Sequence, residues 1–192
     1  FNWALDYLSI DTPWVMRMDA DEYLLPGLAD ELSEKLPDAP REVGGWMVRR
    51  RVYFWGRWIR HGGYYPTWLL RVWRTGVGRL EARFMDEHVV LASGKAARLE
   101  HDIADENLKG LTFWTAKHNH YSDREVLDVI ETGAGGGDTK LPEGQAERRK
   151  LKFSVYGRAP LYLRALLYWA YRYFLRLGFL DGRPGLVFHF LQ

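Results

Sequence analysis

Apolar residues recur along the chain with two different spacings, and the spacing changes at turn residues. Residues 2–8 and 28–36 repeat their apolar side chains every three or four positions, which predicts amphipathic helices, the second ending before Pro37. Shorter runs of β-branched and aromatic residues predict strands, the first of them buried, at residues 14–18, 45–54, 64–73 and 97–101.

The pattern becomes helical again after the last of these strands. Residues 105–117 repeat with helical spacing, and Ser122-Asp123-Arg124-Glu125 has the form of a capping box, which predicts the start of a second helix. Residues 133–137 are glycine-rich and predict a loop. No Gly-Lys-Ser/Thr follows them in register, so they do not match a phosphate-binding loop.

A long apolar run covers residues 161–179 and carries Arg164, Arg172 and Arg176 at helical spacing. Each arginine at a bilayer centre costs about 3 kcal/mol, so the run does not predict a membrane-spanning helix. Basic residues on one side and large aromatics on the other favour a helix lying in a membrane interface. The alternative is a helix that packs against the body of the domain. Residues 178–185 predict a tight turn.

Charge is strongly segregated along the 192 residues, although the net charge is only +2. Residues 1–46 and 84–146 carry net charges of −7 and −6, whereas residues 47–83 and 147–192 carry +8 and +7. Acidic blocks suit metal ions, and basic blocks suit phosphates or anionic lipid. There are no cysteines, which excludes disulfides, thiolate metal sites and cysteine nucleophiles.

The acidic corner, Asp19-Ala20-Asp21-Glu22, directly follows the first predicted strand. Three carboxylates at the end of a buried strand are costly without a counter-charge, and a hard divalent cation is the usual one. Such a cation often bridges to substrate phosphates. The alternative is a solvated turn, in which case the carboxylates are inert. Glu22 can also hold the turn by hydrogen bonding.

Arginines gather on two of the predicted strands. Arg49, Arg50 and Arg51 stand in the middle of one strand, and Arg71 and Arg74 lie near the end of the next. The strands flank Gly62-Gly63, which predicts a hairpin or adjacent strands over an anionic ligand. A solvated basic face is the alternative.

Asp86-Glu87-His88 is a candidate for proton transfer, because apolar residues 89–91 follow it and predict a strand end beside a pocket. Sugar transfer from a nucleotide diphosphate requires a neutralised leaving group and a base for the acceptor hydroxyl. An ordinary polar turn is the alternative. His101 is a candidate imidazole ligand for a metal, while His118 and His120 lack the partner set of a zinc site.

Taken in order, these segments resemble the family 2 glycosyltransferases, closest to the bacterial branch that serves lipopolysaccharide core, capsule and exopolysaccharide assembly. The resemblance rests on the following stretches: Asn2-Trp3-Ala4, Trp14 to Leu24, Leu69 to Arg74, Met85 to His88, Leu99 to Ile103, Lys117 to Tyr121, and Arg172 to Leu186. They extend over nearly the whole chain.

The resemblance implies an α/β fold of the GT-A type, which is Rossmann-like, and inversion at the anomeric carbon. Asp19 and Asp21 correspond to the D-x-D motif that meets Mg²⁺ or Mn²⁺ and the donor diphosphate, with His101 as a further metal or diphosphate contact. Glu87 corresponds to the catalytic base, with Asp86 as its rival. Arg71, Arg74 and His88 are expected to contact phosphate or acceptor.

The same resemblance divides the chain into a partial catalytic domain, residues 1–145, and a basic helical extension, residues 146–192. The nucleotide-binding half of the family domain is expected to precede Phe1. The expected partners are a nucleotide-diphospho-sugar, a glycolipid or polysaccharide acceptor and an anionic membrane surface, with no nucleic acid. The expected location is the cytoplasmic face of a bacterial plasma membrane, as a peripheral protein.

Two other classes of function remain open from the sequence. One is a non-catalytic module that binds glycolipid at a membrane surface through its arginine-rich strands and C-terminal helix. The other is a metal-dependent phosphohydrolase that uses the acidic corner with His118 and His120.

Overall fold

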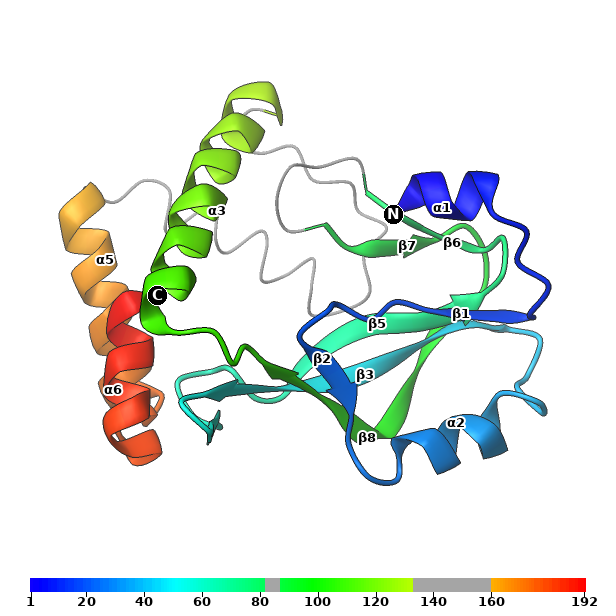
Figure 1. Ribbon diagram of the computed structural model, residues 1–192, viewed down its shortest axis with the longest axis horizontal. Coiled ribbons are helices and arrows are strands. Elements are labelled where there is room, and N and C mark those ends of the chain that lie inside the picture. The colour runs from blue at the N-terminus through cyan, green and yellow to red at the C-terminus, as the bar shows by residue number, and fades with distance from the viewer. Residues whose placement is uncertain (82–86, 133–159) are drawn as a thin grey trace.

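A computed structural model describes residues 1–81, 87–132 and 160–192 of the chain, and these form a mixed α/β structure with a curled sheet (Figure 1). Its elements in chain order are α1 (Asn2–Tyr7), β1 (Trp14–Met16), β2 (Glu22–Leu24), α2 (Leu28–Lys35), β3 (Val43–Phe54), β4 (Arg57–Ile59), β5 (Thr67–Arg74), β6 (Gly78–Leu80), β7 (Val89–Leu91), β8 (Lys95–Glu106), α3 (Leu111–Thr132), α5 (Leu161–Ala170), η2 (Tyr171–Leu175), η3 (Gly178–Asp181) and α6 (Gly182–Leu191). The domain boundary expected at residues 145 and 146 and the loop expected at 133–137 lie outside the described residues.

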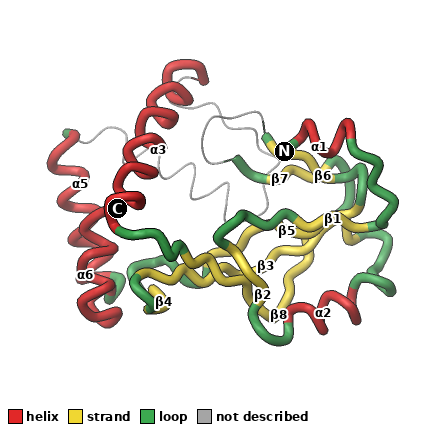
Figure 2. The backbone as a smooth tube through the Cα atoms, viewed as in Figure 1, coloured by secondary structure: helices red, strands yellow, loops and turns green. Residues whose placement is uncertain are grey.

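The sheet is built around β3 and β8, which are the two longest strands and run parallel to each other. In the described part of the chain its order is β1-β5-β3-β8-β2, with β4 paired to β3, and every pair except β3 with β8 is antiparallel. Figure 2 shows these strands crossing the middle of the molecule. The expected pairing of the two arginine-bearing strands is therefore confirmed, since β3 and β5 are neighbours.

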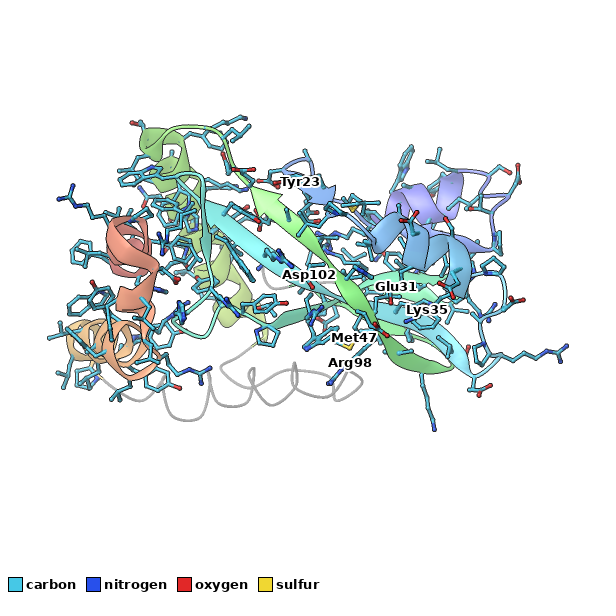
Figure 3. All side chains as sticks on the ribbon, turned by 90° about the horizontal axis from the view of Figure 1, so that it is seen from below. Tyr23, Glu31, Lys35, Met47, Arg98 and Asp102 are labelled. Atoms are coloured by element: carbon cyan, nitrogen blue, oxygen red, sulfur yellow. The ribbon has the colours of Figure 1, made fainter. Side chains whose placement is uncertain are left out.

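Successive side chains of β3 point to opposite faces of the sheet, because a β-strand is pleated. Trp46 and Val48 pack with Leu28 of α2 on one face. Met47 lies on the other face and packs with Trp73 and Val89, beneath α1 and the β6–β7 pair. Figure 1 shows α2 and the β6–β7 pair on opposite sides of the sheet, and Figure 3 shows Met47 together with Arg98 on the side away from α2.

A β-bulge interrupts the pairing of β3 with β5. Trp46 pairs with Val72 and Met47 pairs with Leu70, so Arg71 is an extra residue without a partner in β3. A bulge bends its strand and redirects the side chain at that position. Here it turns Arg71 towards the acidic corner instead of leaving it in the strand alternation.

The helices α3, α5 and α6 gather at the end of the sheet where β3 meets β4 (Figure 1). Phe54, Ile59, Trp114 and Phe188 form the core of this contact. The loop after β4 approaches α6 so closely that a Cβ at Gly62, whose φ is +69°, would lie 2.1 Å from the His189 ring. A larger residue at position 62 is therefore excluded.

Several sequence expectations are wrong in their boundaries. Residues 111–132 form one continuous helix, so Ser122–Glu125 lies inside α3 and does not start a helix. Asp105 and Glu106 belong to β8, because they pair with Glu22 of β2 and with β3, and such tertiary pairing overrides local propensity. The strand β1 is half-buried rather than buried, since in the described sheet it pairs only with β5.

The C-terminal run also differs from the single helix expected over residues 161–179. It begins as α5, continues as the π-helical turn η2 and ends at Leu177, whose φ is +59°. Residues 182–185, expected in a turn, begin α6. In the described ranges no helix combines the length and apolar character needed to cross a membrane.

Arg172 does not belong to a solvent-facing row of arginines. Its Nε donates to the Gly62 carbonyl at 3.0 Å, and its guanidinium lies 4.0 Å from the centre of the Tyr64 ring. The side chain is buried. The expectation of a basic row is therefore wrong at this position, because Arg172 joins the C-terminal helices to the loop between β4 and β5.

Candidate functional site

The acidic corner forms the turn between β1 and β2. The chain leaves β1 with the Arg17 amide bonded to the Arg71 carbonyl at 2.9 Å, and the turn closes with the Glu22 amide bonded to the Asp19 carbonyl at 3.0 Å. Glu22 then starts β2 opposite Asp105 of β8. The corner is thus fixed to β5 on one side and to β8 on the other.

Glu22 is the structural carboxylate of the corner. Only 1 % of its side chain is exposed, and it accepts hydrogen bonds from the Asp19 amide at 3.0 Å and from the Arg71 guanidinium. Asp19 and Asp21 remain accessible, with 41 % and 28 % of their side chains exposed. The prediction that Glu22 holds the turn is confirmed.

Asp19 lies between two arginines. Arg71 Nη2 is 3.1 Å from one carboxylate oxygen, and Arg17 Nε is 3.3 Å from the other. Partial burial opposes ionisation of Asp19, but the charges and hydrogen bonds of Arg71 and Arg17 outweigh it and lower its pKa. Asp19 is therefore held as a carboxylate.

Asp21 is paired with a lysine from a distant part of the chain. Lys117 of α3 places its ammonium 3.2 Å from one oxygen of Asp21, and the Asp21 carbonyl accepts the Glu106 amide at 2.9 Å. Burial works to lower the pKa of Lys117, but its hydrogen bond to Asp21 and the Asp21 charge outweigh this and raise it. The lysine therefore remains a cation.

Arg50 and Asp105 complete the cluster from the neighbouring strands. Arg50 Nη1 lies 3.3 Å from Asp105. Burial is the main reason that the pKa of Asp105 is raised, and the nearby charges of Asp21 and Glu22 add to the effect against the opposing influence of Arg50. The Nε atoms of Arg50 and Arg71 are both buried and have no hydrogen-bond partner among the described residues. Buried N–H donors of this kind favour an additional oxygen-bearing ligand.

The corner supplies a limited set of metal ligands. Among the described residues no group of three or more His, Asp or Glu side chains is arranged to hold a metal ion. Both oxygens of Asp19 already face arginines, whereas Asp21 has a single cationic partner. Mg²⁺ commonly takes one or two protein carboxylates and fills its remaining positions with water and substrate phosphate. Asp21 fits that requirement, whereas Asp19 fits it only where one of its oxygens leaves its arginine.

His101 does not lie with these carboxylates. It is five residues from Glu106 along β8, which corresponds to roughly 16 Å in an extended strand, and Glu106 is the residue beside Asp21. Its Nδ1 lies 2.9 Å from Glu31 of α2. Glu31 is buried, yet bonds from Lys35, from His101 and from two backbone amides lower its pKa to about 2. His101 is thus part of the α2–β8 contact, and a shared metal site with Asp21 is not formed.

Arg74 also has a different environment from the one expected. Its guanidinium donates to the carbonyls of Ala39, Pro40 and Val43 at 2.9–3.1 Å and lies 4.5 Å from the centre of the Trp14 ring. These bonds anchor the loop between α2 and β3. Arg74 pairs with Trp14, at the start of β1, whereas the acidic corner follows the end of β1. Arg74 therefore does not face Asp19.

The Asp86-Glu87-His88 segment is only partly described. Asp86 lies outside the described residues, and Glu87 is exposed. The His88 amide donates to Glu81 at 3.2 Å, and its Nδ1 is 3.5 Å from the same carboxylate. No hydrogen bond or ion pair joins Glu87 to the acidic corner within the described segments, so its catalytic role remains a prediction.

Three residues that complete the cluster were not expected at the corner: Arg50 (predicted only to face an anionic ligand with Arg49 and Arg51), Asp105 and Lys117. They come from β3, β8 and α3, and only the pairing of those elements brings them to the corner. One signal was available in the sequence. Side chains alternate along a strand, which places Arg50 on the opposite face from Arg49 and Arg51. No known protein-family model matches the chain.

Proposed function

We propose that the chain forms the catalytic part of an inverting glycosyltransferase with a GT-A fold. It moves a sugar from a nucleotide-diphospho-sugar to a lipid-linked or polysaccharide acceptor in bacterial envelope glycan synthesis. The observation that carries this proposal is the division of the acidic corner into one buried carboxylate, Glu22, and two accessible ones, Asp19 and Asp21.

Asp21 and Asp19 hold the divalent cation, Mg²⁺ or Mn²⁺, which supplies neutralisation of the leaving diphosphate. Arg71 and Arg50 stand beside them with buried Nε–H donors that are not yet satisfied, and these donors suit diphosphate oxygens. Lys117 is a third cation at the same place and exchanges its contact with Asp21 for a phosphate oxygen when the donor binds.

The reaction requires one base. Glu87 takes the proton of the acceptor hydroxyl while that oxygen bonds to the anomeric carbon and the bond from carbon to the diphosphate oxygen breaks. Asp86 is the rival for this role. The exposure of Glu87 leaves its carboxylate available to an acceptor.

Donor turnover tests this proposal, measured on the protein together with whatever sequence flanks residues 1–192. Asp21→Asn and Glu87→Gln are each expected to reduce turnover by about 100-fold or more. Glu100→Gln, at an exposed carboxylate on β8, is the matched control and keeps full turnover. Chelation abolishes activity and Mn²⁺ or Mg²⁺ restores it. Near-normal turnover in both variants would show that this mechanism is wrong.

The C-terminal helices support the proposed contact with an anionic membrane. Several large apolar side chains of α5 and η2 are more than half exposed: Leu166, Leu167, Phe174 and Leu175. Arg176 is exposed near them. An interfacial helix combines these features, which supports peripheral binding at the cytoplasmic face. Flotation with phosphatidylglycerol vesicles tests it, and Leu167→Asp with Leu175→Asp is expected to remove binding.

The phosphohydrolase alternative gains no support from its histidines. The His118 ring stacks on Trp114 with a centroid distance of 3.5 Å, and its Nδ1 lies 2.8 Å from the Trp114 carbonyl. Burial lowers the pKa of His118. These contacts commit His118 to the packing of α3 rather than to the acidic corner.

A further inference from the structure

The three consecutive arginines of β3 do not share one surface. Side chains alternate along a strand, so Arg49 and Arg51 point to the face opposite Arg50. Arg50 joins the acidic corner through Asp105, while Arg49 and Arg51 share Asp102 of β8. The second face therefore carries its own arginine cluster.

Asp102 organises this second cluster. Its side chain is 1 % exposed, and its two oxygens accept the Nε–H groups of Arg49 and Arg51, each at 2.6 Å. Tyr65 donates its hydroxyl to the same carboxylate at 3.0 Å. The carboxylate binds both arginines through Nε, and the two arginine side chains remain 29 % and 33 % exposed.

Aromatic rings hold further arginines beside this pair. The guanidinium carbons of Arg51 and Arg60 lie 4.4 and 5.2 Å from the centroid of the Trp58 ring. The Trp68 ring has Arg49 at 5.5 Å and Arg98 at 4.9 Å. Arg60 and Arg98 are exposed and form no ion pair with a described carboxylate. We call Arg49, Arg51, Arg60, Arg98, Trp58 and Trp68 the arginine–aromatic face.

We propose that the arginine–aromatic face is a binding site for a phosphate ester dianion, separate from the acidic corner. The face holds four arginines and one buried carboxylate, which pairs with Arg49 and Arg51, so it carries excess positive charge that a dianion balances better than a carboxylate does. The arginine fork matches the oxygens of phosphate, and fixed guanidinium groups lose little entropy on binding. This site does not rest on the proposed glycosyltransferase activity.

The energetic argument follows from how the arginines are restrained. Two guanidinium groups on one carboxylate are close enough to repel each other, and their aromatic neighbours limit how far they can turn away. A bound phosphate relieves this repulsion without requiring the arginines to move. Since the site is partly exposed, its affinity falls as ionic strength rises.

The test titrates the full chain with inorganic phosphate in the presence of a chelator, following the indole N–H resonances of Trp58 and Trp68 by NMR. Arg60→Gln and Arg98→Gln leave both Asp102 contacts intact and are each expected to weaken binding by about tenfold. Arg41→Gln removes the same charge from an exposed loop position and changes the affinity by less than about twofold. Asp21→Asn also leaves phosphate binding unchanged, so this site can fail or succeed independently of the acidic corner.

Additional measurements on the same variants identify the source of the phosphate. Weaker flotation of Arg60→Gln and Arg98→Gln with vesicles that contain phosphatidic acid assigns it to a lipid headgroup, and unchanged flotation with weaker phosphate binding assigns it to a soluble or glycan-borne ester. Equal phosphate affinity in all variants, or no measurable binding, would overturn the proposal. Tighter binding of glucuronate, or of a single-stranded oligonucleotide at matched phosphate concentration, would overturn the assignment to a phosphate ester.

Discussion

The acidic corner and the arginine–aromatic face each use arginines of β3, but their charges are balanced differently. At the corner four carboxylates meet four cationic side chains, Asp19, Asp21, Glu22 and Asp105 with Arg17, Arg50, Arg71 and Lys117. On the other face Arg49 and Arg51 share one carboxylate, Asp102, while Arg60 and Arg98 lie over the Trp58 and Trp68 rings. The corner is balanced by itself, so an incoming diphosphate needs an added cation there. The arginine–aromatic face can bind an anion directly.

The largest expected effect comes from removing Arg71. Arg71→Met leaves the Glu22 carboxylate buried with no cation beside it, and breaking a buried ion pair in this way costs about 3–5 kcal/mol. Chemical denaturation measures the free energy of unfolding. The double variant Arg71→Met with Glu22→Gln is the control, because it removes both charges and recovers part of the loss. If Arg71→Met lowered the free energy of unfolding by less than about 1 kcal/mol, the buried Glu22 carboxylate would not depend on Arg71 for its stability.

A smaller loss is expected when the single carboxylate of the other face is removed. Asp102→Asn leaves Arg49 and Arg51 without their partner, but both are about one-third exposed and can turn to water, so the cost is about 2 kcal/mol. The same variant is expected to weaken phosphate binding, because the two guanidinium groups are no longer held together.

The control for this second prediction is Glu106→Gln, which changes a carboxylate of the same strand that accepts only the exposed Tyr23 hydroxyl at 3.0 Å. It is expected to leave stability and phosphate binding unchanged. The two variants leave different kinds of unpaired charge: the buried Glu22 carboxylate in Arg71→Met, and the partly exposed Arg49 and Arg51 in Asp102→Asn. If Asp102→Asn proved more destabilising than Arg71→Met, this contrast would be wrong.

The smallest expected effect comes from two carboxylates of the corner whose pKa values shift in opposite directions on folding. Folding lowers the pKa of Asp19, so its stabilising contribution is complete above the unfolded pKa of about 4 and is lost as the pH falls through the lower folded value. Folding raises the pKa of Asp105, so its ionisation is a penalty that grows as the pH rises from about 4 through the raised value.

Asp105→Asn is therefore expected to stabilise the protein at pH 7, by roughly 0.5 kcal/mol, and to lose this advantage near pH 3. Asp19→Asn is expected to destabilise at pH 7 and to converge with the wild type at low pH. Thermal unfolding from pH 3 to pH 7 measures both. Parallel curves for the two variants would contradict the opposite pKa shifts.

Local patterns predicted many of the elements well. The helix at residues 28–36 is α2, and the strand at 45–54 lies inside β3, because apolar spacing in each is clear and proline or glycine marks the ends. The acidic corner was found for the same reason, since it follows a recognisable strand. The continuous α3 was missed because Ser122–Glu125 satisfies the capping pattern whether or not a helix starts there.

Local sequence patterns could not predict which partners surround each charged side chain. His101 and Arg74 were expected beside the diphosphate, yet they hold α2 and its following loop in place. Arg172 was expected in the basic row of an interfacial helix, yet it is buried against Tyr64. In each case the partner is more than 25 positions away in the chain, so no short-range spacing reports it.

The sequence alone determined the position of the acidic corner, the candidate base at Glu87 and the run of arginines in β3. The tertiary structure decided how these charges are shared. The bulge turns Arg71 towards Asp19 and Glu22, and the pleat sends Arg50 to one face and Arg49 and Arg51 to the other. The physical reason is that charge partners are chosen by strand register and helix packing, which depend on contacts far apart in the chain.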